Sequence, residues 1–209
     1  NLTIPKLNVT SQFYKRLLWL YMFNVHVHND NTSFLYCFME NQAKKDANSV
    51  ASFLHNTLEI KLKEFQDIRD IVFLSDAADG QNKNKTMVQF SLWVSKVFGV
   101  NVLQLFPVCG RSFSQCDRNF GLVKSYVKKE PTITTAKPYL EAMVHARKNP
   151  PFTVVFDKSL IKDWSAALEP MFLKNPTGRN NNFRIQSYVQ IKYKANGALL
   201  PSCTYEPIY

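Results

Sequence analysis

The chain opens with two apolar runs separated by a polar turn. Residues 13–27 are rich in aromatic and β-branched side chains, which favours a long strand over a solvent-facing helix. Residues 33–39 form a second run of this kind, and the segment from His28 to Asn31 has the composition of a turn. The pattern predicts an antiparallel hairpin.

Beyond the hairpin the apolar spacing changes to steps of three and four residues, the period of a helix. Asp46 or Asn48 can cap this helix. Its apolar positions are Val50, Phe53, Leu54, Leu58, Leu62 and Phe65. We expect the helix to pack on one face of a sheet.

Strands and helices then alternate. The run from Ile71 to Leu74 is short and uninterrupted, which is typical of a strand buried on both faces in the middle of a sheet. A helical pattern extends from Val88 to Phe98, and Gly99 stands where a C-terminal cap belongs. A strand over 102–108 and a helix over 112–127 follow. This order predicts an α/β sheet with parallel central strands and helices on its faces.

The regular alternation of predicted strands and helices ends after about residue 131. The patterns there predict a helix over 132–149, a strand over 152–156, an amphipathic helix over 159–172 and an alternating strand over 183–193. We therefore expect a core domain over residues 1–130 and a smaller C-terminal α+β extension over residues 131–209.

Composition narrows the class of protein. Of 209 residues, 45% are apolar, and no run of about 18 uncharged apolar residues could span a membrane. Four cysteines lack the spacing of a zinc site or a disulfide framework. The motifs GxSxG, HExxH, GxGxxG and the P-loop are absent, which argues against the hydrolases, zinc proteases, kinases and dinucleotide enzymes that they define.

The chain is basic, with a net charge of +10 and a pI near 9.4. Residues 1–100 carry 11 Lys or Arg against 9 Asp or Glu, whereas residues 101–209 carry 15 against 7. A surplus of this size suits a polyanionic partner or simply keeps the protein soluble. If there is such a partner, we expect its surface in the second half.

Two aspartates are the main candidates for chemistry. Asp76 directly follows an apolar strand, at the carboxyl end where open α/β sheets bind ligands, although turns also use Asp in this position. Asp117 begins a helix, and with Ser114 it also fits a capping box. If both lean over one sheet edge, they form an oxygen site for Mg²⁺ or Mn²⁺ that could align a water with a phosphodiester.

Other titratable residues are weaker candidates. Glu40 and Asp79 could each supply a third carboxylate to this metal site, or they could be solvated turn residues. His26 and His28 lie two apart on one strand face and could share a metal, but no further ligand stands at a suitable spacing. His55 and His145 are expected on helix surfaces.

Basic residues accompany both aspartates. Lys83 and Lys85 follow Asp76, and the cations around Asp117 alternate with aromatic side chains. The latter cations are Arg111, Arg118, Lys124, Lys128 and Lys129. Such a cluster could bind a phosphate backbone, or it could be the solvated face of a helix.

Two strings in this region carry a resemblance. The segment from Ser75 to Asn84 (SDAADGQNKN), followed by Gly110 to Phe113 and by Cys116 to Gly121 (CDRNFG), resembles an uncharacterised transposon-associated family of animal genomes with a ribonuclease H-like core. Further similar residues occur at 13–19, Glu40 and 150–152, so that the resemblance extends over most of the chain.

The resemblance implies a ribonuclease H-like mixed sheet, as in transposases and integrases. It makes Asp76 the second and Asp117 the third metal-binding acid, with the first acid upstream of Asn1. Two departures from the family pattern are Ala77 to Asp79, where the family has Asn-Cys-Gly, and Arg111, where it has His.

These features suggest a transposase-derived, nuclear domain that acts on nucleic acid, DNA in preference to RNA. The ancestral activity would be Mg²⁺- or Mn²⁺-dependent phosphodiester cleavage or strand transfer at Asp76 and Asp117. Lys83, Lys85, Arg111, Arg118 and Lys124 would contact phosphates. The alternative is an inactive, domesticated scaffold that binds nucleic acid or another protein, and a module that binds no nucleic acid is a third hypothesis.

Overall fold

The computed structural model describes residues 1–209 except 8–15, 66, 108–113, 131, 173–182 and 206–209. The chain divides into two compact units, each made of two segments. Unit 1 comprises residues 1–45 and 113–161, and unit 2 comprises residues 46–112 and 162–209. The domain boundary predicted at residues 130/131 therefore lies inside unit 1.

Unit 1 is built on the predicted hairpin. Strand β2 (Leu18–Val27) pairs antiparallel with β3 (Thr32–Met39), which confirms the hairpin from residue 18 onward. The first residues of the predicted strand, 13–15, lie outside the described residues. Strand β1 (Leu2–Ile4) pairs antiparallel with β2, and β6 (Thr153–Val155) pairs parallel with β3, giving the order β1-β2-β3-β6.

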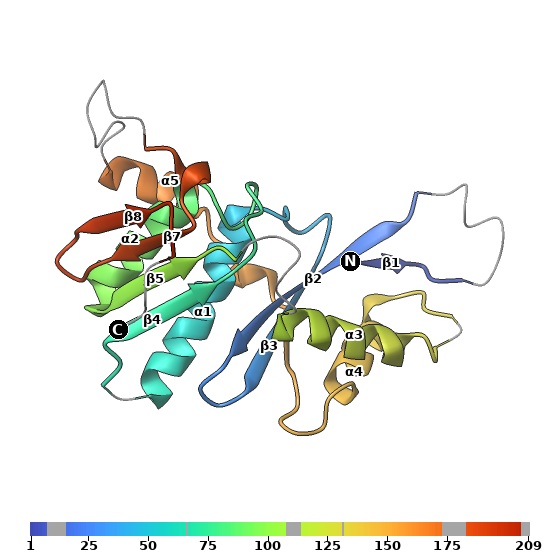
Figure 1. Cartoon of the computed structure of the whole chain (residues 1–209). Helices are drawn as coiled ribbons and strands as arrows, with labels where there is room; N and C mark the ends of the chain where they lie inside the picture. Colours follow the sequence, from blue (N-terminus) through green and yellow to red (C-terminus); the bar gives the residue numbers. More distant parts are fainter. Residues whose placement is uncertain (8–15, 66, 108–113, 131, 173–182, 206–209) are drawn as a thin grey trace. The chain divides into compact units, whose positions relative to one another are not determined.

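Two helices cover this sheet. Helix α3 (Gln115–Val127) packs on β2 and on α4 (Ala136–His145), as Figure 1 shows. Alternate residues of the hairpin face them, because side chains of a strand point to opposite faces in turn. The shared core contains Leu20, Met22, Leu35, Cys37, Val123, Val127, Tyr139 and Met143. Lys6 donates hydrogen bonds from Nζ to the carbonyl of Val127, at the end of α3, and to the carbonyl of Glu130, just beyond it.

Unit 2 has the sheet order β4-β5-β7-β8. Strands β4 (Asp70–Leu74) and β5 (Asn101–Leu105) are parallel, as predicted. Strands β7 (Gln190–Tyr193) and β8 (Leu199–Ser202) add antiparallel pairs. Helices α1 (Ala47–Glu64), α2 (Lys85–Phe98) and α5 (Trp164–Leu168) pack against one another (Figure 1).

The helix ends follow local rules. Asp46 caps α1 by accepting a hydrogen bond from the backbone of Ser49, and Asn84 caps α2 in the same way through Met87. Gly99 ends α2 with φ of 68°, a left-handed conformation that glycine adopts without steric cost. The predictions of a cap at Asp46 and at Gly99 are confirmed.

The α/β class is confirmed, but the described strands form two sheets where the sequence suggests one. The hairpin and the parallel pair β4–β5 belong to different sheets. A strand has two edges, and those of β3 are already occupied by β2 and β6. Hence β4 has no edge of β3 to pair with.

The prediction that Ile71 to Leu74 form a doubly buried central strand is wrong. Strand β4 lies at the edge of its sheet, and Val72 and Leu74 are 49% and 54% exposed. The central position next to it belongs to β5, because β7 arrives from the C-terminal segment and pairs with the other edge of β5. A short apolar run does not by itself distinguish these positions.

Two C-terminal predictions are also corrected. The helix expected over 159–172 is broken into a 3₁₀ turn (Lys158–Leu160), α5, and a second 3₁₀ turn (Glu169–Met171). Asp163 caps the start of α5, and Pro170, near the start of the second 3₁₀ turn, cannot continue the hydrogen bonds of α5. The strand expected over 183–193 is confined to β7, preceded by a 3₁₀ turn (Ile185–Ser187). Strand β8, which contains Pro201, was not predicted; proline is tolerated there because β8 is an edge strand.

Candidate functional site

Asp76 lies in the loop that connects β4 to α2. Its side chain is exposed and accepts a hydrogen bond from Nδ2 of Asn82. The carbonyl of Ala78 accepts hydrogen bonds from the backbone N–H groups of residues 81–83. The polar string around Asp76 is therefore shaped by bonds within the loop, which is the turn role that the sequence left open.

Lys83 has an internal position in unit 2. It is 6% exposed, its Nζ donates to the carbonyl of Gln186 at 2.9 Å, and the same Nζ lies 4.9 Å from the centre of the Phe106 ring. Gln186 returns a hydrogen bond from Nε2 to the carbonyl of Lys83. Burial lowers the pKa of Lys83, and the charge of Asp79 opposes this shift. The ammonium group of Lys83 thus points into the interior of unit 2.

Asp117 forms the capping box of α3. Its Oδ2 accepts hydrogen bonds from the backbone N–H of Ser114 at 3.2 Å and from the Ser114 hydroxyl at 2.9 Å. The Ser114 hydroxyl in turn accepts from the backbone N–H of Asp117 at 3.2 Å. The capping box that the sequence offered as the alternative role of Asp117 is present.

The two candidate acids belong to different units, Asp76 to unit 2 and Asp117 to unit 1. Within the part of the chain that the structure describes, no group of three or more His, Cys, Asp and Glu side chains could hold a metal ion. A two-metal phosphodiester site needs several carboxylates converging on one point. The described residues therefore do not fit a Mg²⁺ or Mn²⁺ centre.

The other predicted phosphate contacts are divided between the units as well. Lys85, in unit 2, lies 3.7 Å from Glu169, and both side chains are largely exposed. Arg118 and Lys124 are exposed on α3 in unit 1. Arg111 lies outside the described residues.

The charge surplus is concentrated in unit 1. Unit 1 contains 13 Lys or Arg against 6 Asp or Glu, and unit 2 contains 13 against 10. Net charges of +7 and +3 follow from these counts. The surplus positive charge of unit 1 thus comes from both halves of the sequence, because unit 1 combines residues 1–45 with residues 113–161.

Helix α3 presents an important part of that surplus. Val123, Val127 and Asn119 face the core, so the helical period places the intervening cations on the exposed side. We call four exposed side chains the α3 basic face: Arg118 and Lys124 on α3, and Lys128 and Lys129 directly after its last residue. Gly121 interrupts this face, and the space where its Cβ would stand has no atom within 4 Å. A ligand can therefore approach the helix backbone closely there.

A buried polar network joins α3 to the hairpin. Nδ2 of Asn119 donates to Oδ1 of Asn24 and to the hydroxyl of Ser33, both at 2.9 Å. Nδ1 of His26 lies 2.8 Å from the same Ser33 hydroxyl. The thiol of Cys116 points to the carbonyl of Asn24 at 3.5 Å. The CDRNFG string thus contains contacts that dock α3, a role that sequence reasoning missed because the partners are about a hundred positions away.

The surroundings of His26 and Cys116 favour the uncharged form of each side chain. Burial, followed by the charges of His28 and Arg147, lowers the pKa of His26, while Thr32 and Asp30 act in the opposite direction. Burial raises the pKa of the Cys116 thiol to about 11. The rings of His26 and His28 meet edge to face at 4.6 Å. These residues form a packed network without the ligand set of a metal site.

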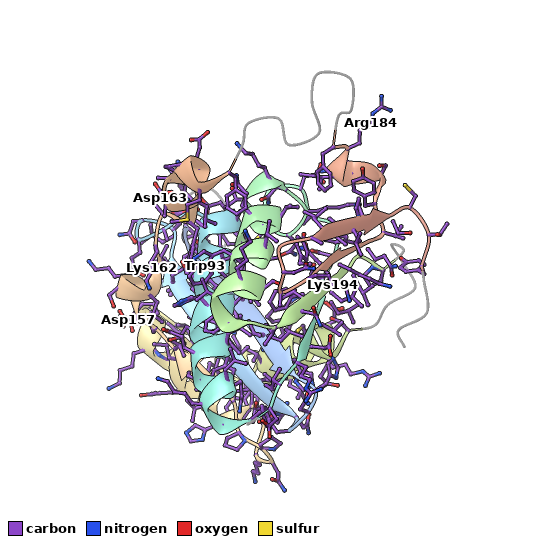
Figure 2. The ribbon with its side chains drawn as sticks, turned by 90° about the vertical axis from the view of Figure 1, so that its left-hand side faces the viewer. Trp93, Asp157, Lys162, Asp163, Arg184 and Lys194 are labelled. Atoms are coloured by element: carbon purple, nitrogen blue, oxygen red, sulfur yellow. The ribbon has the colours of Figure 1, made fainter. Side chains whose placement is uncertain are left out.

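Sequence reasoning also missed an aromatic cluster in unit 2. The rings of Trp93 and Trp164 lie 4.9 Å apart, and His55 contacts both. Trp164 donates from Nε1 to the Ser52 hydroxyl at 3.1 Å. Figure 2 shows Trp93 and Lys162 on one side of this unit. The cluster joins α5 to α1 and α2, and the prediction of a surface position for His55 is wrong, since its side chain is only 12% exposed.

A surface pocket of about 540 Å³ lies in unit 1, at the start of β2 and the end of β3. Its lining residues are Arg16, Leu18, Tyr21, Glu40, Asn41, Ala43, Lys44 and Lys45. Arg16 and Glu40 form an ion pair at 3.7 Å across this site. Glu40, a candidate third carboxylate in the sequence, therefore has a basic partner within unit 1.

Comparison with known proteins places the chain in a family. No curated protein and no solved structure matches it. No helix among the described residues is both long and apolar enough to cross a membrane. A domain of unknown function, DUF8701, matches residues 10–159, which include most of unit 1 and the first segment of unit 2. Since this match covers more than half of the sequence, the chain belongs to the DUF8701 family.

Proposed function

We propose that the protein binds nucleic acid, DNA in the first place, through the α3 basic face of unit 1. The supporting observation is that exposed cations gather on and directly after one helix of the unit that carries most of the net charge. Such a face neutralises phosphates and releases counterions on binding. The resemblance of the SDAADGQNKN and CDRNFG strings to a transposon-associated, ribonuclease H-like family supports the same partner.

The proposal is for binding without cleavage. Asp117 is engaged in the capping box, and Asp76 is bonded to its own loop in the other unit. Of the predicted phosphate contacts, Arg118 and Lys124 belong to the proposed face, whereas Lys83 is bonded inside unit 2. We therefore favour the domesticated binding scaffold over a metal-dependent nuclease.

Charge reversal on α3 tests the proposal. Binding of the full chain to a labelled DNA duplex is measured by fluorescence anisotropy at several salt concentrations, with and without EDTA. The double variant Lys124→Glu, Lys128→Glu is expected to bind at least about tenfold more weakly. The matched control is Lys63→Glu, Lys96→Glu, which changes the charge equally on exposed lysines of unit 2.

The outcomes separate the proposed face from general charge. A small loss in the control, with no effect of EDTA, supports the proposed face. Equal losses in the two variants would show that net charge alone drives binding. No binding to DNA or RNA at low salt would contradict the proposal and favour a protein-binding scaffold.

A further inference from the structure

We infer that α3 enters the major groove of double-stranded DNA and that Leu122 contacts the 5-methyl groups of thymine there. This inference rests on the proposed function and deepens it, because it names the form of DNA, the groove and a residue that reads bases. The evidence for it comes from the uncharged residues between the cations of the α3 basic face.

The exposed side of α3 combines charged ends with an uncharged middle. Arg118 lies near the start of the helix, and residues 128–129 are lysines that directly follow its last residue. Gly121, Leu122 and Ser125 lie between these cations and are exposed. Leu122 comes four residues after Arg118 and three before Ser125, so that these side chains share one side of the helix.

This arrangement suits the major groove of B-form DNA, which is about 12 Å wide and admits an α-helix. Because a helix rises about 1.5 Å per residue, Arg118 and Lys128 are about 15 Å apart along the axis of α3. Cations at this spacing can reach phosphates on both sides of the groove, and the uncharged residues between them then face the base edges. Lys124, two positions after Leu122, lies on the other flank of the helix and can contact a phosphate as well.

The cations of the α3 basic face are available to phosphates. Among the described residues, none of the four takes part in an ion pair. Asp117, the carboxylate next to Arg118 in sequence, accepts hydrogen bonds from Ser114 in the capping box.

Gly121 leaves the backbone of α3 open in the middle of this side. A Cβ at this position would have no atom within 4 Å, so the packing of unit 1 does not require a glycine. Glycine inside a helix costs stability relative to alanine, because it loses more conformational freedom on folding. The close approach of base edges to the helix backbone gives this glycine a role.

Leu122 is the apolar side chain on the exposed side of α3. It is 42% exposed. In the major groove, the 5-methyl group of thymine is the apolar group that the base pairs present. The hydroxyl of Ser125 can bond to any base pair, because it both donates and accepts. Leu122 should therefore carry a preference for thymine.

Three probes change the methyl groups or the groove at equal charge. They are a DNA duplex of alternating adenine and thymine, the same duplex with uracil in place of thymine, and an RNA duplex of alternating adenine and uracil. Thymine occurs at every second position, so that each register of the protein meets methyl groups. Binding of the full chain is measured by fluorescence anisotropy at constant salt.

The parent should bind the thymine duplex about fourfold more tightly than the uracil duplex, the equivalent of one buried methylene group. Leu122→Ala should bind both DNA duplexes equally. Val144→Ala, at a 44% exposed position of α4 in the same unit, is the matched control and should keep the preference. The RNA duplex should bind at least about tenfold more weakly, because its major groove is too deep and narrow for side chains to read.

Two variants of Gly121 test the close approach separately. Gly121→Ala and Gly121→Leu place better helix formers where the structure has room, so the midpoint of thermal unfolding should stay equal or rise. The DNA affinity should nevertheless fall in the order glycine, alanine, leucine, by at least about fivefold for Gly121→Leu. An unchanged affinity in a folded Gly121→Leu would overturn the groove contact.

The outcomes distinguish this inference from the proposed function. Equal binding of the three probes by the parent, or loss of the thymine preference in Val144→Ala as well, would overturn the inference. The Lys124→Glu, Lys128→Glu experiment would then still decide whether the α3 basic face binds phosphates. Absence of binding to every probe at low salt would overturn both.

Discussion

The side-chain amide of Asn119 on α3 donates a hydrogen bond to Oδ1 of Asn24 on β2 at 2.9 Å, and both residues are buried. Nδ2 of Asn24 in turn donates a hydrogen bond to the carbonyl of Phe34 at 2.9 Å. Two amides in an apolar interior are tolerated because each has partners, and the loss of one would leave the other unsatisfied.

Replacement of Asn119 by leucine should therefore destabilise unit 1. We expect the free energy of unfolding to fall by about 1–3 kcal/mol, since Asn24 and Ser33 would lose a buried donor. Urea denaturation followed by circular dichroism measures the change. The control Ser125→Ala, on the exposed side of α3, should change little; similar losses in both variants would show that the network is not special.

Replacement of Asp117 should affect both the stability of the fold and the affinity for DNA. Asp117→Ala removes one half of the capping box, and we expect a loss of about 1 kcal/mol in unfolding free energy. The same change removes a negative charge beside the α3 basic face and should leave DNA affinity equal or higher. Anisotropy titration checks the second part. A large loss of affinity would instead indicate that Asp117 takes part in binding.

The binding of DNA should weaken steeply with salt. If the four cations of the α3 basic face each neutralise one phosphate, a plot of the logarithm of the binding constant against that of the salt concentration has a slope of about −3 to −4. The variant Lys124→Glu, Lys128→Glu should reduce the magnitude of the slope by about 2. A slope that is unchanged in this variant would place the phosphate contacts elsewhere.

Stability should depend on the protonation of His26. Its pKa is lowered in the folded state, so below the ordinary value of about 6.5 the unfolded chain binds more protons than the folded one. The free energy of unfolding should then fall as the pH drops from about 6.5 towards the lowered pKa, and level off below it. His26→Gln should reduce this pH dependence. His145→Gln, at an exposed helix position, is the matched control; equal pH profiles of parent and His26→Gln would contradict the prediction.

The edge position of β4 predicts that a valine on β4 tolerates a polar replacement better than a valine on the neighbouring strand β5. Val72→Thr, at a half-exposed position of β4, should cost less than about 0.5 kcal/mol. Val102→Thr, at a buried position of β5, places a hydroxyl in the core and should cost about 1–3 kcal/mol. Urea denaturation of both variants measures the difference, which would vanish if β4 were as buried as β5.

Much of the local structure follows from residues close together in sequence. The caps at Asp46 and Gly99 depend on contacts within a few positions, and the hairpin joins two strands that are neighbours in the chain; these were predicted. The capping box at Ser114 and Asp117 is equally local, and the sequence offered it as one of two roles for Asp117. The division of the segment 159–172 was not predicted, because its apolar spacing suits one continuous helix. The edge strand with Pro201 was not predicted either, because tertiary pairing decides where such a strand forms.

The candidate site was predicted less well. The sequence singles out Arg118 and Lys124, which are exposed on one helix, together with Lys83, which is bonded inside unit 2. A lysine's role depends on the carbonyl or ring that meets its ammonium group, and for Lys83 these belong to Gln186 and Phe106. The pocket was missed for the same reason, since Arg16 and Glu40 meet only when the hairpin closes.

The sequence alone determined the hairpin, most of the helices and strands between residues 46 and 127, the caps at Asp46 and Gly99 and the basic character of the chain, because those properties depend on composition and on residues near one another in the chain. Only the tertiary structure decided which strands share a sheet, that β4 is an edge, that Asp76 and Asp117 belong to different units, and that the surplus charge is greatest in unit 1. Strand pairing and side-chain burial join residues far apart in the chain, and no local pattern encodes which edge or ring each will meet.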